Sequence, residues 1–420
     1  MYKMSRHLAF LTAAFTAFAA SAEVLERNEG IKIGERLTLR PSVSVSLSYD
    51  SNVDGNRGRT VNGGSDCDIM LSVSPQLWLH YNAETWSLIL SGFYNYRHYF
   101  ESAHRALDHH DFGEDLRFNW SSSSGREKGW SLVLGQSFHR VTTADDLTAE
   151  DRSYDSDASQ FQLSAALQRR ITQRLHADVN ASYYWLKYDN ATRSDRLAYY
   201  GWDRWMIGAE AGYALSRWAD FIVSGSLQGY SQDNNQGTGY SSDSKGCSLQ
   251  VGFASFMTER ISYRLLGGWS RFEYASDLSS CNGFVYTASG NWKIGETWNT
   301  MLLGSSYYQP SERQQTSHSR VDAISWGLAK TMVRGKLRAT FDLRYRHETI
   351  DYDGGDMTAD WDYALDIWTG RLGLDYSLNR LLSCYAAVEY QKSFNDHASE
   401  RHGAYDYDRW RVTGGFRLSY

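Results

Sequence analysis

Apolar and polar side chains alternate along the last eleven residues of the chain. Every second residue from Trp410 to Tyr420 is apolar or small, namely Trp, Val, Gly, Phe, Leu and Tyr, whereas the residues between them are mostly polar. A period of two predicts a β-strand with one apolar face and one wet face. Taken alone, this alternation is typical of any half-buried strand. It gains weight because it recurs along nearly the whole chain.

The alternation predicts about eighteen strands from Leu37 onwards, an even number, as single-chain bacterial barrels have. Leu337–Tyr345 is a clear example, whereas the stretch around Ile324 is only weakly patterned. Pro41 and Pro75 fall at similar heights in the first two strands. Because proline has no backbone N–H to give to a β-ladder, we expect a local bulge or seam there.

The connections between the expected strands alternate in length. The short ones centre on Asn82, Gly125, Thr172, Trp218, Glu259, Gly295, Arg334 and Asn379. The long polar ones span residues 51–66, 101–110, 142–157, 189–201, 231–246, 309–320, 348–362 and 393–406, with a shorter one at 276–281. Short periplasmic turns and longer extracellular loops are the rule for outer-membrane barrels, so both termini are expected on the periplasmic side.

The composition supports a membrane barrel. Mean hydropathy is −0.53, yet 15% of the residues are aromatic, and 3 prolines stand against 35 glycines. Beyond the first residues, no apolar run approaches the ~18 residues of a transmembrane helix. Aromatic residues recur at both ends of the expected strands, as in the girdles at the two membrane interfaces. We therefore predict an all-β fold, a transmembrane antiparallel β-barrel over residues 37–420, in preference to a soluble propeller or sandwich with a core of aromatic residues. A propeller would also need blade repeats, which are missing.

The first 22 residues read as a signal peptide. Lys3 and Arg6 precede the apolar run Leu8–Ala20, and Ala20-Ser21-Ala22 is a small-x-small cleavage site. An amphipathic N-terminal helix is the alternative. Residues 23–36 then form a polar periplasmic lead. Cleavage removes two bases from a chain of net charge −6 and leaves about −8, which argues against nucleic-acid binding.

Charged residues recur at the positions between the apolar ones, which predicts a polar and wet interior. The candidate pore-lining residues are Arg97, Arg117, Arg264, Arg338, Asp342, Arg344, Arg346, Arg371, Asp375, Glu389, Arg411 and Arg417. The arginines of the late strands would form a basic stripe that attracts anionic solutes. Equally, they would pair with the carboxylates of those strands in a structural ladder. An interior of about eighteen strands is wide enough for an aqueous channel unless loops plug it.

Four cysteines are present, and export permits disulfides. Cys67, Cys247 and Cys281 fall at the loop ends of expected strands, whereas Cys384 would face lipid. The pair Cys247–Cys281 is the disulfide candidate, with free thiols as the alternative.

Candidate metal ligands occur in two loops, and neither set predicts a site. The acidic loop does not have the spacing of an EF-hand, so a solvated loop is favoured. It contains Asp351, Asp353, Asp356 and Asp360. A group of histidines lacks a fixed geometry, and it consists of His104, His109 and His110. No nucleophile–base spacing rises above chance, so no catalytic residue, metal or cofactor is assigned and no enzyme activity is expected.

The end of the first strand carries the sequence Tyr-Asp-Ser-Asn-Val at residues 49–53. It resembles the first-strand Tyr-Asp-x-Asn-Val motif of a family of outer-membrane β-barrel porins that are often associated with exopolysaccharide synthesis and export. The terminal strand resembles the signature by which the barrel-assembly machinery recognises outer-membrane proteins. At the outer rim, Asp50 and Asn52 would shape the turn by bonding their own backbone.

The resemblance implies a porin-like passive channel in the outer membrane of a Gram-negative cell, serving transport of polar solutes or polysaccharide export. Its expected partners are the lipid bilayer, the barrel-assembly machinery and the transported solute, and not nucleic acid. Two alternatives remain open. One is a closed structural or adhesive barrel whose extracellular loops bind partners, and the other is a membrane-embedded hydrolase.

Overall fold

The computed structural model describes most of the chain from Gly30 to the C-terminus. It covers residues 30–52, 67–100, 108–122, 129–142, 157–188, 201–216, 218–232, 243–255, 260–274, 280–310, 316–333, 335–352, 363–395 and 407–420. The expected signal peptide, residues 1–22, lies outside this part. So do residues 23–29 of the expected lead and most of the long loops.

Nineteen β-strands account for most of the described residues. They are β1 (Ile31–Ile33), β2 (Leu37–Asp50), β3 (Asp68–Asn82), β4 (Trp86–Tyr99), β5 (His109–Ser121), β6 (Trp130–Thr142), β7 (Asp157–Arg170), β8 (Leu175–Tyr188), β9 (Trp202–Ser216), β10 (Ala219–Gln232), β11 (Ser244–Ser255), β12 (Ile261–Tyr274), β13 (Cys281–Ile294), β14 (Trp298–Pro310), β15 (Thr316–Met332), β16 (Leu337–Tyr352), β17 (Tyr363–Ser377), β18 (Leu382–Asn395) and β19 (Tyr407–Ser419).

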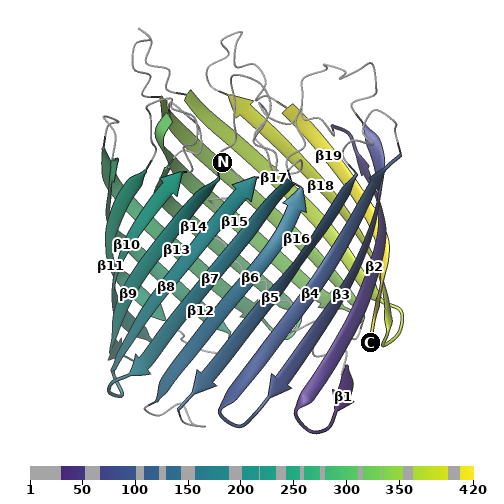
Figure 1. Cartoon of the computed structure of the whole chain (residues 1–420), viewed down its shortest axis with the longest axis horizontal. Helices are drawn as coiled ribbons and strands as arrows, with labels where there is room; N and C mark the ends of the chain where they lie inside the picture. The colour runs from purple at the N-terminus through teal and green to yellow at the C-terminus, as the bar shows by residue number, and fades with distance from the viewer. Residues whose placement is uncertain are drawn as a thin grey trace.

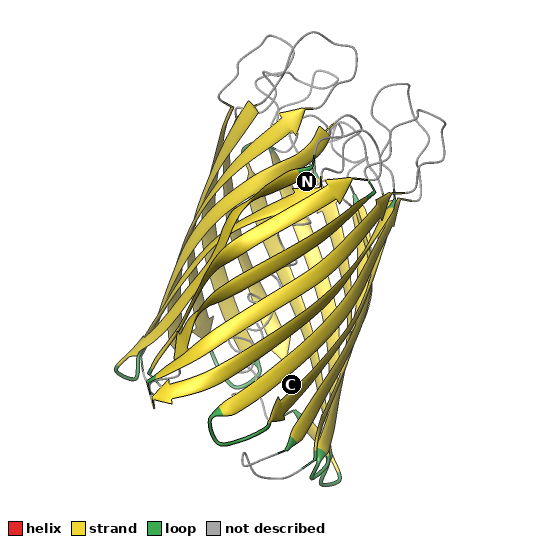
Figure 2. Ribbon diagram, turned by 90° about the vertical axis from the view of Figure 1, so that its left-hand side faces the viewer, coloured by secondary structure: helices red, strands yellow, loops and turns green. Residues whose placement is uncertain are grey.

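Strands β2 to β19 form a closed barrel (Figures 1 and 2). Each pairs antiparallel with the next along the chain, and β19 pairs antiparallel with β2, from Ser419 opposite Ser42 to Arg411 opposite Asp50. The predicted eighteen-strand barrel is therefore confirmed. The weakly patterned stretch around Ile324 lies in β15, which has 17 residues. It pairs with β14 in one register, and its register with β16 shifts once, between Thr316 and His318.

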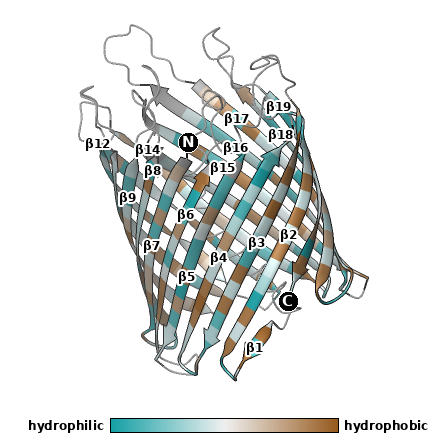
Figure 3. Cartoon of the chain, turned by 45° about the vertical axis from the view of Figure 1, so that its right-hand side comes forward, coloured by the Kyte–Doolittle hydropathy of each residue, from teal (hydrophilic) through white to brown (hydrophobic). Residues whose placement is uncertain are grey.

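The two faces of the wall differ as the alternation predicts. Along the strands, hydrophobic and hydrophilic residues follow one another in short bands (Figure 3). The apolar side chains point outward and are well exposed, for example Leu47 at 53%, Leu372 at 60% and Phe416 at 59%. Closing the sheet pairs both edges of every strand in the ring, as a bilayer requires because it offers the backbone no hydrogen-bond partner. The described residues contain no helix of the length and hydropathy that crossing a membrane requires.

The barrel has a short-turn end and a long-loop end. The turn between β13 and β14 is residues 295–297, where Gly295 has a φ of 65° that favours glycine. The strand ends that flank the longer connections lie at the opposite end of the barrel (Figure 2). The C-terminus and β1 both lie at the short-turn end (Figure 1).

Strand β1 was not predicted from the sequence. Its residues Ile31–Ile33 pair with Leu37–Leu39 of β2 across a turn that contains Gly34, which has a φ of 68°. The last pair of β19 with β2 involves Ser42, so β19 does not reach these first residues of β2. Strand β1 therefore covers an edge that would otherwise be open for pairing.

The prolines interrupt the ladder without shifting it. Pro75 faces Val43 in β2, and Pro41 lies opposite Leu77, so the two prolines are at similar heights as expected. No bulge separates β2 from β3. The ladder between β3 and β4 instead breaks at Ser74 and Pro75 and resumes in the same register. Pro41 lies where β19 ends, and its carbonyl accepts the N–H of the C-terminal residue at 3.1 Å.

Candidate functional site

The inner face of β16–β19 carries the densest charge of the described barrel wall, and we call it the arginine wall. Its outward neighbours are exposed apolar residues such as Leu372 and Leu374, which alternate with the inward Arg371. The arginines of this wall are Arg338, Arg344, Arg346, Arg371, Arg409, Arg411 and Arg417, and its carboxylates are Asp342, Glu348, Asp375 and Glu389. All candidates from these strands thus occupy inward positions, and Arg409 and Glu348 join them.

One row of this wall alternates in charge across five strands. Asp342 of β16 lies opposite Arg371 of β17, which lies opposite Glu389 of β18. Glu389 in turn lies opposite Arg411 of β19, and Arg411 lies opposite Asp50 of β2. Opposite charges at directly opposite positions stabilise neighbouring strands, whereas like charges destabilise them. The register is thus the one that a structural ladder requires, and the sequence alone could not reveal it. Among these five residues, Arg411 and Asp50 lie within ion-pair distance, at 3.1 Å.

The row ends in a buried cluster at the seam where the barrel closes. The Nε of Arg409 donates to both carboxylate oxygens of Asp50 at 2.8 and 2.9 Å, and Nη2 of Arg409 also contacts Oδ2. Arg411 donates to the same Oδ2 at 3.1 and 3.2 Å. The side chains of Asp50 and Arg409 are 5% and 7% exposed. Such charge-assisted bonds, with two donors of one guanidinium on one carboxylate, are among the strongest in proteins.

Asn52 completes this cluster, which we call the seam clasp. Its backbone N–H donates to Oδ1 of Asp50 at 3.2 Å, which is the local turn bond expected from the sequence. Its side-chain amide donates to the carbonyl of Asp408 in β19 at 3.2 Å. The Asp and Asn of the Tyr-Asp-x-Asn-Val sequence therefore tie the first barrel strand to the last. Sequence reasoning missed this role, although Arg409 has the same parity as the predicted Arg411.

The other late arginines differ in their surroundings. Arg346 is buried and donates to Glu348 at 2.6 Å. Its charge is therefore compensated, and its side chain is not accessible to a solute. Arg417 lies 5.6 Å from the ring centre of Tyr385. Arg338 is opposite Asp375, in the register expected of an ion-pair ladder.

Arg344 and Arg417 are arginines of this wall with only uncharged residues opposite them; those opposite Arg417 are Ser383 and Ser44. Arg344 lies opposite Ser325 in β15 and Thr369 in β17, neither of which is charged. Its side chain is exposed. Because Arg344 is exposed and does not lie over an aromatic ring as Arg417 does, it is the arginine best placed to contact a solute inside the barrel.

The candidates from the earlier strands also point inward and have partners. Arg97 contacts Asp111 at 3.1 Å. Arg117 donates to the side chain of Asn119 at 3.1 Å. Arg264 donates to both carboxylate oxygens of Glu210, with one bond of 2.8 Å. These arginines therefore stabilise the wall where they lie.

Exposure of the inner face changes with height. At the long-loop end, inward residues are withdrawn from solvent, for example Trp202 at 2%, Val321 at 0% and Leu365 at 6%. At mid-height, Arg344 and Arg371 are exposed. The described part of the interior is thus accessible from its middle towards the short-turn end, and buried near the long loops.

The disulfide expected between Cys247 and Cys281 is absent, and both thiols are free, as are Cys67 and Cys384. Cys247 is exposed on the outer face of β11, whereas Cys281 is buried on the inner face of β13. Strand β12 lies between them, so the two Cα atoms are separated by about 10 Å of sheet. That exceeds the ~7 Å limit for a disulfide, and the side chains point in opposite directions. The opposite parity of the two residues was already visible in the sequence.

The candidate metal ligands form no site among the described residues, where no group of His, Cys, Asp or Glu side chains could hold a metal ion. His110 points outward and bonds the hydroxyl of Tyr94 at 2.5 Å. His104, Asp353, Asp356 and Asp360 lie outside the described residues. For Asp351 and His109 only the strand position is described.

Several solved structures share the barrel architecture at very low sequence identity. The siderophore receptor PirA from Pseudomonas aeruginosa is 9% identical over 93% of this chain and 81% of its own, with a TM-score of 0.44. The FrpB iron transporter from Neisseria meningitidis, in its F5-1 variant apoprotein form, is 10% identical over 92% and 82%, with a TM-score of 0.45. The outer membrane protein OpdK from Pseudomonas aeruginosa is 11% identical over 91% and 99%, with a TM-score of 0.43. No curated protein sequence matches the chain.

The family comparison is far more specific, because a family described as "Putative beta-barrel porin 2" matches residues 27–420. That range takes in β1, every strand of the barrel and the seam clasp. The match agrees with the closed ring of strands, the apolar outer face and the family resemblance of residues 49–53. The chain is therefore a porin-like outer-membrane β-barrel and belongs to this β-barrel porin family.

Proposed function

We propose that this barrel is a passive channel for polar solutes, with a preference for anions set by Arg344. The observation that carries the proposal is an exposed arginine at mid-height on the inner wall, opposite only uncharged neighbours in the two adjacent strands. A cation that is already paired contributes little to the potential felt by a passing ion, whereas an unpaired one attracts anions. The proposed role is transport and not catalysis.

The test is single-channel conductance of the refolded protein in a planar bilayer under a salt gradient, from which the reversal potential gives ion selectivity. We expect a steady conductance with anion preference in the wild type. Arg344→Glu should shift the reversal potential towards cation preference, because it replaces a positive charge inside the channel by a negative one. Arg346 is unsuitable for this test, since its reversal would break a buried ion pair.

Lys336→Glu is the matched control. It makes the same change in net charge, but Lys336 is an exposed residue in the short turn between β15 and β16. Its effect on selectivity should be much smaller than that of Arg344→Glu, and it should fade at high salt because of screening. Equal shifts in both variants would contradict a role for Arg344 in particular. A folded protein that conducts no ions would contradict the channel itself.

A closed structural barrel is the second candidate, and one observation favours it. Inward side chains at the long-loop end are almost fully buried, including Trp202 and Val321. A barrel blocked at that end would show no conductance in the folded wild type. Conductance that appears only after Trp202→Ala would support a gate at this height.

We also propose that both termini lie in the periplasm. The described ends of the chain lie together with the short turns, and short turns are periplasmic in known barrels (Figure 1). The chain ends in the exposed apolar residues Phe416 and Leu418 of β19 and Tyr420 directly after it, which supports recognition by the barrel-assembly machinery. For the transported solute we propose a polysaccharide, because the family resemblance points to polysaccharide export. Block of the conductance by acidic oligosaccharides, but not by neutral ones of equal size, would support it.

A further inference from the structure

An unpaired carboxylate interrupts the apolar outer surface of the described wall. Glu114 of β5 points outward and is exposed, between the outward residues Phe112 and Leu116. It lies six residues from Trp120, which is at the short-turn end of the strand. Four other outward acidic residues whose side chains the structure describes lie within three residues of the long-loop ends of their strands, namely Asp203, Glu273, Asp366 and Asp408. A fifth, Asp322, lies deeper in β15 but is paired with Arg320 at 3.2 Å. A charge this far inside the apolar band is unfavourable unless it is paired.

A polar residue lies beside Glu114 at the same depth. Gln136 of β6 points outward and is six residues from Trp130, just as Glu114 is six residues from Trp120 in the same hairpin. Leu116 lies opposite Gln136 and Glu114 lies opposite Phe138, so the two polar residues are diagonal neighbours. Among the described residues, neither side chain forms a hydrogen bond. Both groups are therefore available to a partner in the membrane plane.

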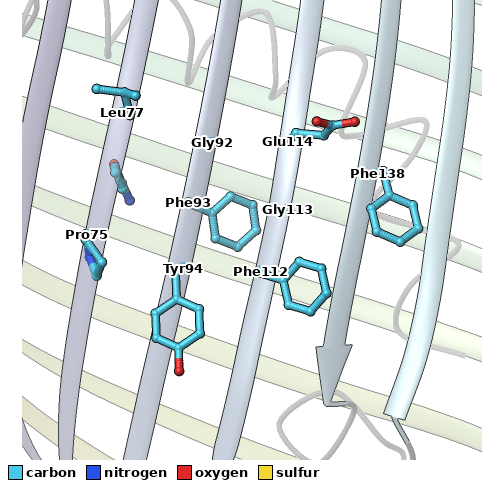
Figure 4. A pocket seen from close by; sticks show the side chains of 10 residues that line it. Pro75, Leu77, Gly92, Phe93, Tyr94, Phe112, Gly113, Glu114 and Phe138 are labelled. Carbon is cyan, nitrogen blue, oxygen red and sulfur yellow. The ribbon is translucent and has the colours of Figure 1, made fainter.

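A hollow of about 640 Å³ opens beside Glu114 (Figure 4). Seven of its ten lining residues have outward parity, namely Pro75, Leu77, Gly92, Tyr94, Phe112, Glu114 and Phe138. Gly92 forms part of the floor, and a Cβ added there would have no atom closer than 3.9 Å. The interruption of the ladder between β3 and β4 is next to this floor, at Pro75. The hollow is large enough for an aromatic side chain from outside.

We propose that this outer surface of β3–β6 is the interface between two copies of the chain, related by a two-fold axis normal to the membrane. In such an interface each residue pair occurs twice with the partners exchanged. Glu114 of one copy accepts a hydrogen bond from the side-chain amide of Gln136 in the other, and the reverse pair forms on the other side of the axis. This geometry requires the two residues to lie at equal depth, as they do. Phenylalanine side chains of each copy fill the hollow of the other.

The chemistry favours a second copy over lipid. An acyl chain can fill an apolar hollow, but it has no donor for the carboxylate of Glu114 and no acceptor for the amide of Gln136. Both residues have a complementary partner on the same surface of an identical chain. The inference concerns the outer face alone, so it is independent of the proposed channel function.

The experiment measures the oligomeric state of the full chain by native mass spectrometry from a mild detergent and by subunit counting in lipid nanodiscs. We expect the wild type to be a dimer. Glu114→Leu and Gln136→Leu should each weaken association at least tenfold. The exchange variant, which combines Glu114→Gln with Gln136→Glu, should restore the dimer because the reciprocal pair forms again with its members exchanged.

Thr300→Leu is the matched control, since it replaces an outward polar residue on β14 far from this surface. It should leave the dimer unchanged. Heat-modifiable mobility on SDS gels checks that each variant is folded. A monomeric wild type, or a dimer of unchanged stability in both leucine variants, would overturn the proposal. Failure of the exchange variant to restore the dimer would overturn the Glu114–Gln136 pairing.

Discussion

The inner face of β8–β10 lies across the barrel from the arginine wall, because β8 and β17 are nine strands apart in a ring of eighteen. Near the long loops it packs aromatic rings. Trp202 stacks on Tyr184 at a centroid distance of 4.8 Å and lies 5.5 Å from Tyr230. Leu186 and Ala158 are buried in the same cluster. Arg204 lies opposite both tyrosines, half-buried, and donates to the side chain of Gln228, which is uncharged. At the same end, the arginine wall instead buries arginines paired with carboxylates, namely the seam clasp and the pair of Arg346 with Glu348.

The two walls bury inward side chains in physically different ways. Aromatic packing is non-directional, so it tolerates small shifts of the strands. Buried ion pairs stabilise the fold only while their geometry is maintained, and removing one partner leaves an uncompensated buried charge. The difference matters most at the seam, where β2 and β19 come from opposite ends of the chain. An ionic clasp there specifies which strand closes the barrel, whereas apolar contacts would not.

The largest effect is expected from Asp50→Ala. The variant leaves Arg409 and Arg411 without their carboxylate, and breaking a buried ion pair costs about 3–5 kcal/mol. Urea unfolding in lipid vesicles, followed by tryptophan fluorescence, measures the loss. Ser46→Ala, on the same face of β2, is the control and should change the unfolding free energy by less than about 0.5 kcal/mol. Equal stability of the two variants would contradict the clasp.

Trp202→Ala should cost somewhat less, about 3 kcal/mol, at the lower end for loss of a buried aromatic side chain. Because this wall is held by packing, the cost should be the same at low and high salt. Trp202→Phe keeps a stacked ring and should lose less than half as much. A loss that falls at high salt would show that the aromatic cluster stabilises the wall mainly through charges nearby.

The sequence predicted the faces of these walls but not their partners. Alternation alone assigned Arg371, Asp375 and Arg411 to the inner side, since a period of two fixes the face of each residue. Which charges lie opposite one another depends on register, which alternation does not give. The pairing of Asp50 with Arg409 joins residues 359 positions apart, so no local pattern could indicate it.

Two features were missed and one was wrongly expected, each for a different reason. Strand β1 has only three residues, too few for a period to be seen. The disulfide between Cys247 and Cys281 was expected from loop-end positions, although the parity of the neighbouring Leu249 and Phe284 already placed the two thiols on opposite faces. The surface around Glu114 could not be identified without the strand register, because only the pairing of β5 with β6 brings Gln136 beside Glu114.

A smaller effect is expected at the seam from Ser48→Ala. The hydroxyl of Ser48 in β2 is hydrogen-bonded to that of Thr413 in β19 at 2.8 Å. Loss of one such bond costs about 1 kcal/mol. Thr413→Val should cost a similar amount, and the double variant should cost less than the two losses added together, because they remove the same bond. Full additivity would show that the two hydroxyls do not stabilise the seam as a pair.

The smallest effect separates the two interpretations of the arginine wall. Arg371 lies between Asp342 and Glu389, whereas Arg344 lies between uncharged residues. Arg371→Gln should therefore lower the unfolding free energy by up to about 1 kcal/mol, the range of exposed ion pairs. Arg344→Gln should leave it unchanged. The loss in Arg371→Gln should shrink at high salt, since exposed charges are screened. If Arg344→Gln cost as much as Arg371→Gln, the alternating row would not act as a ladder, and both arginines would have to be counted as free lumen charges.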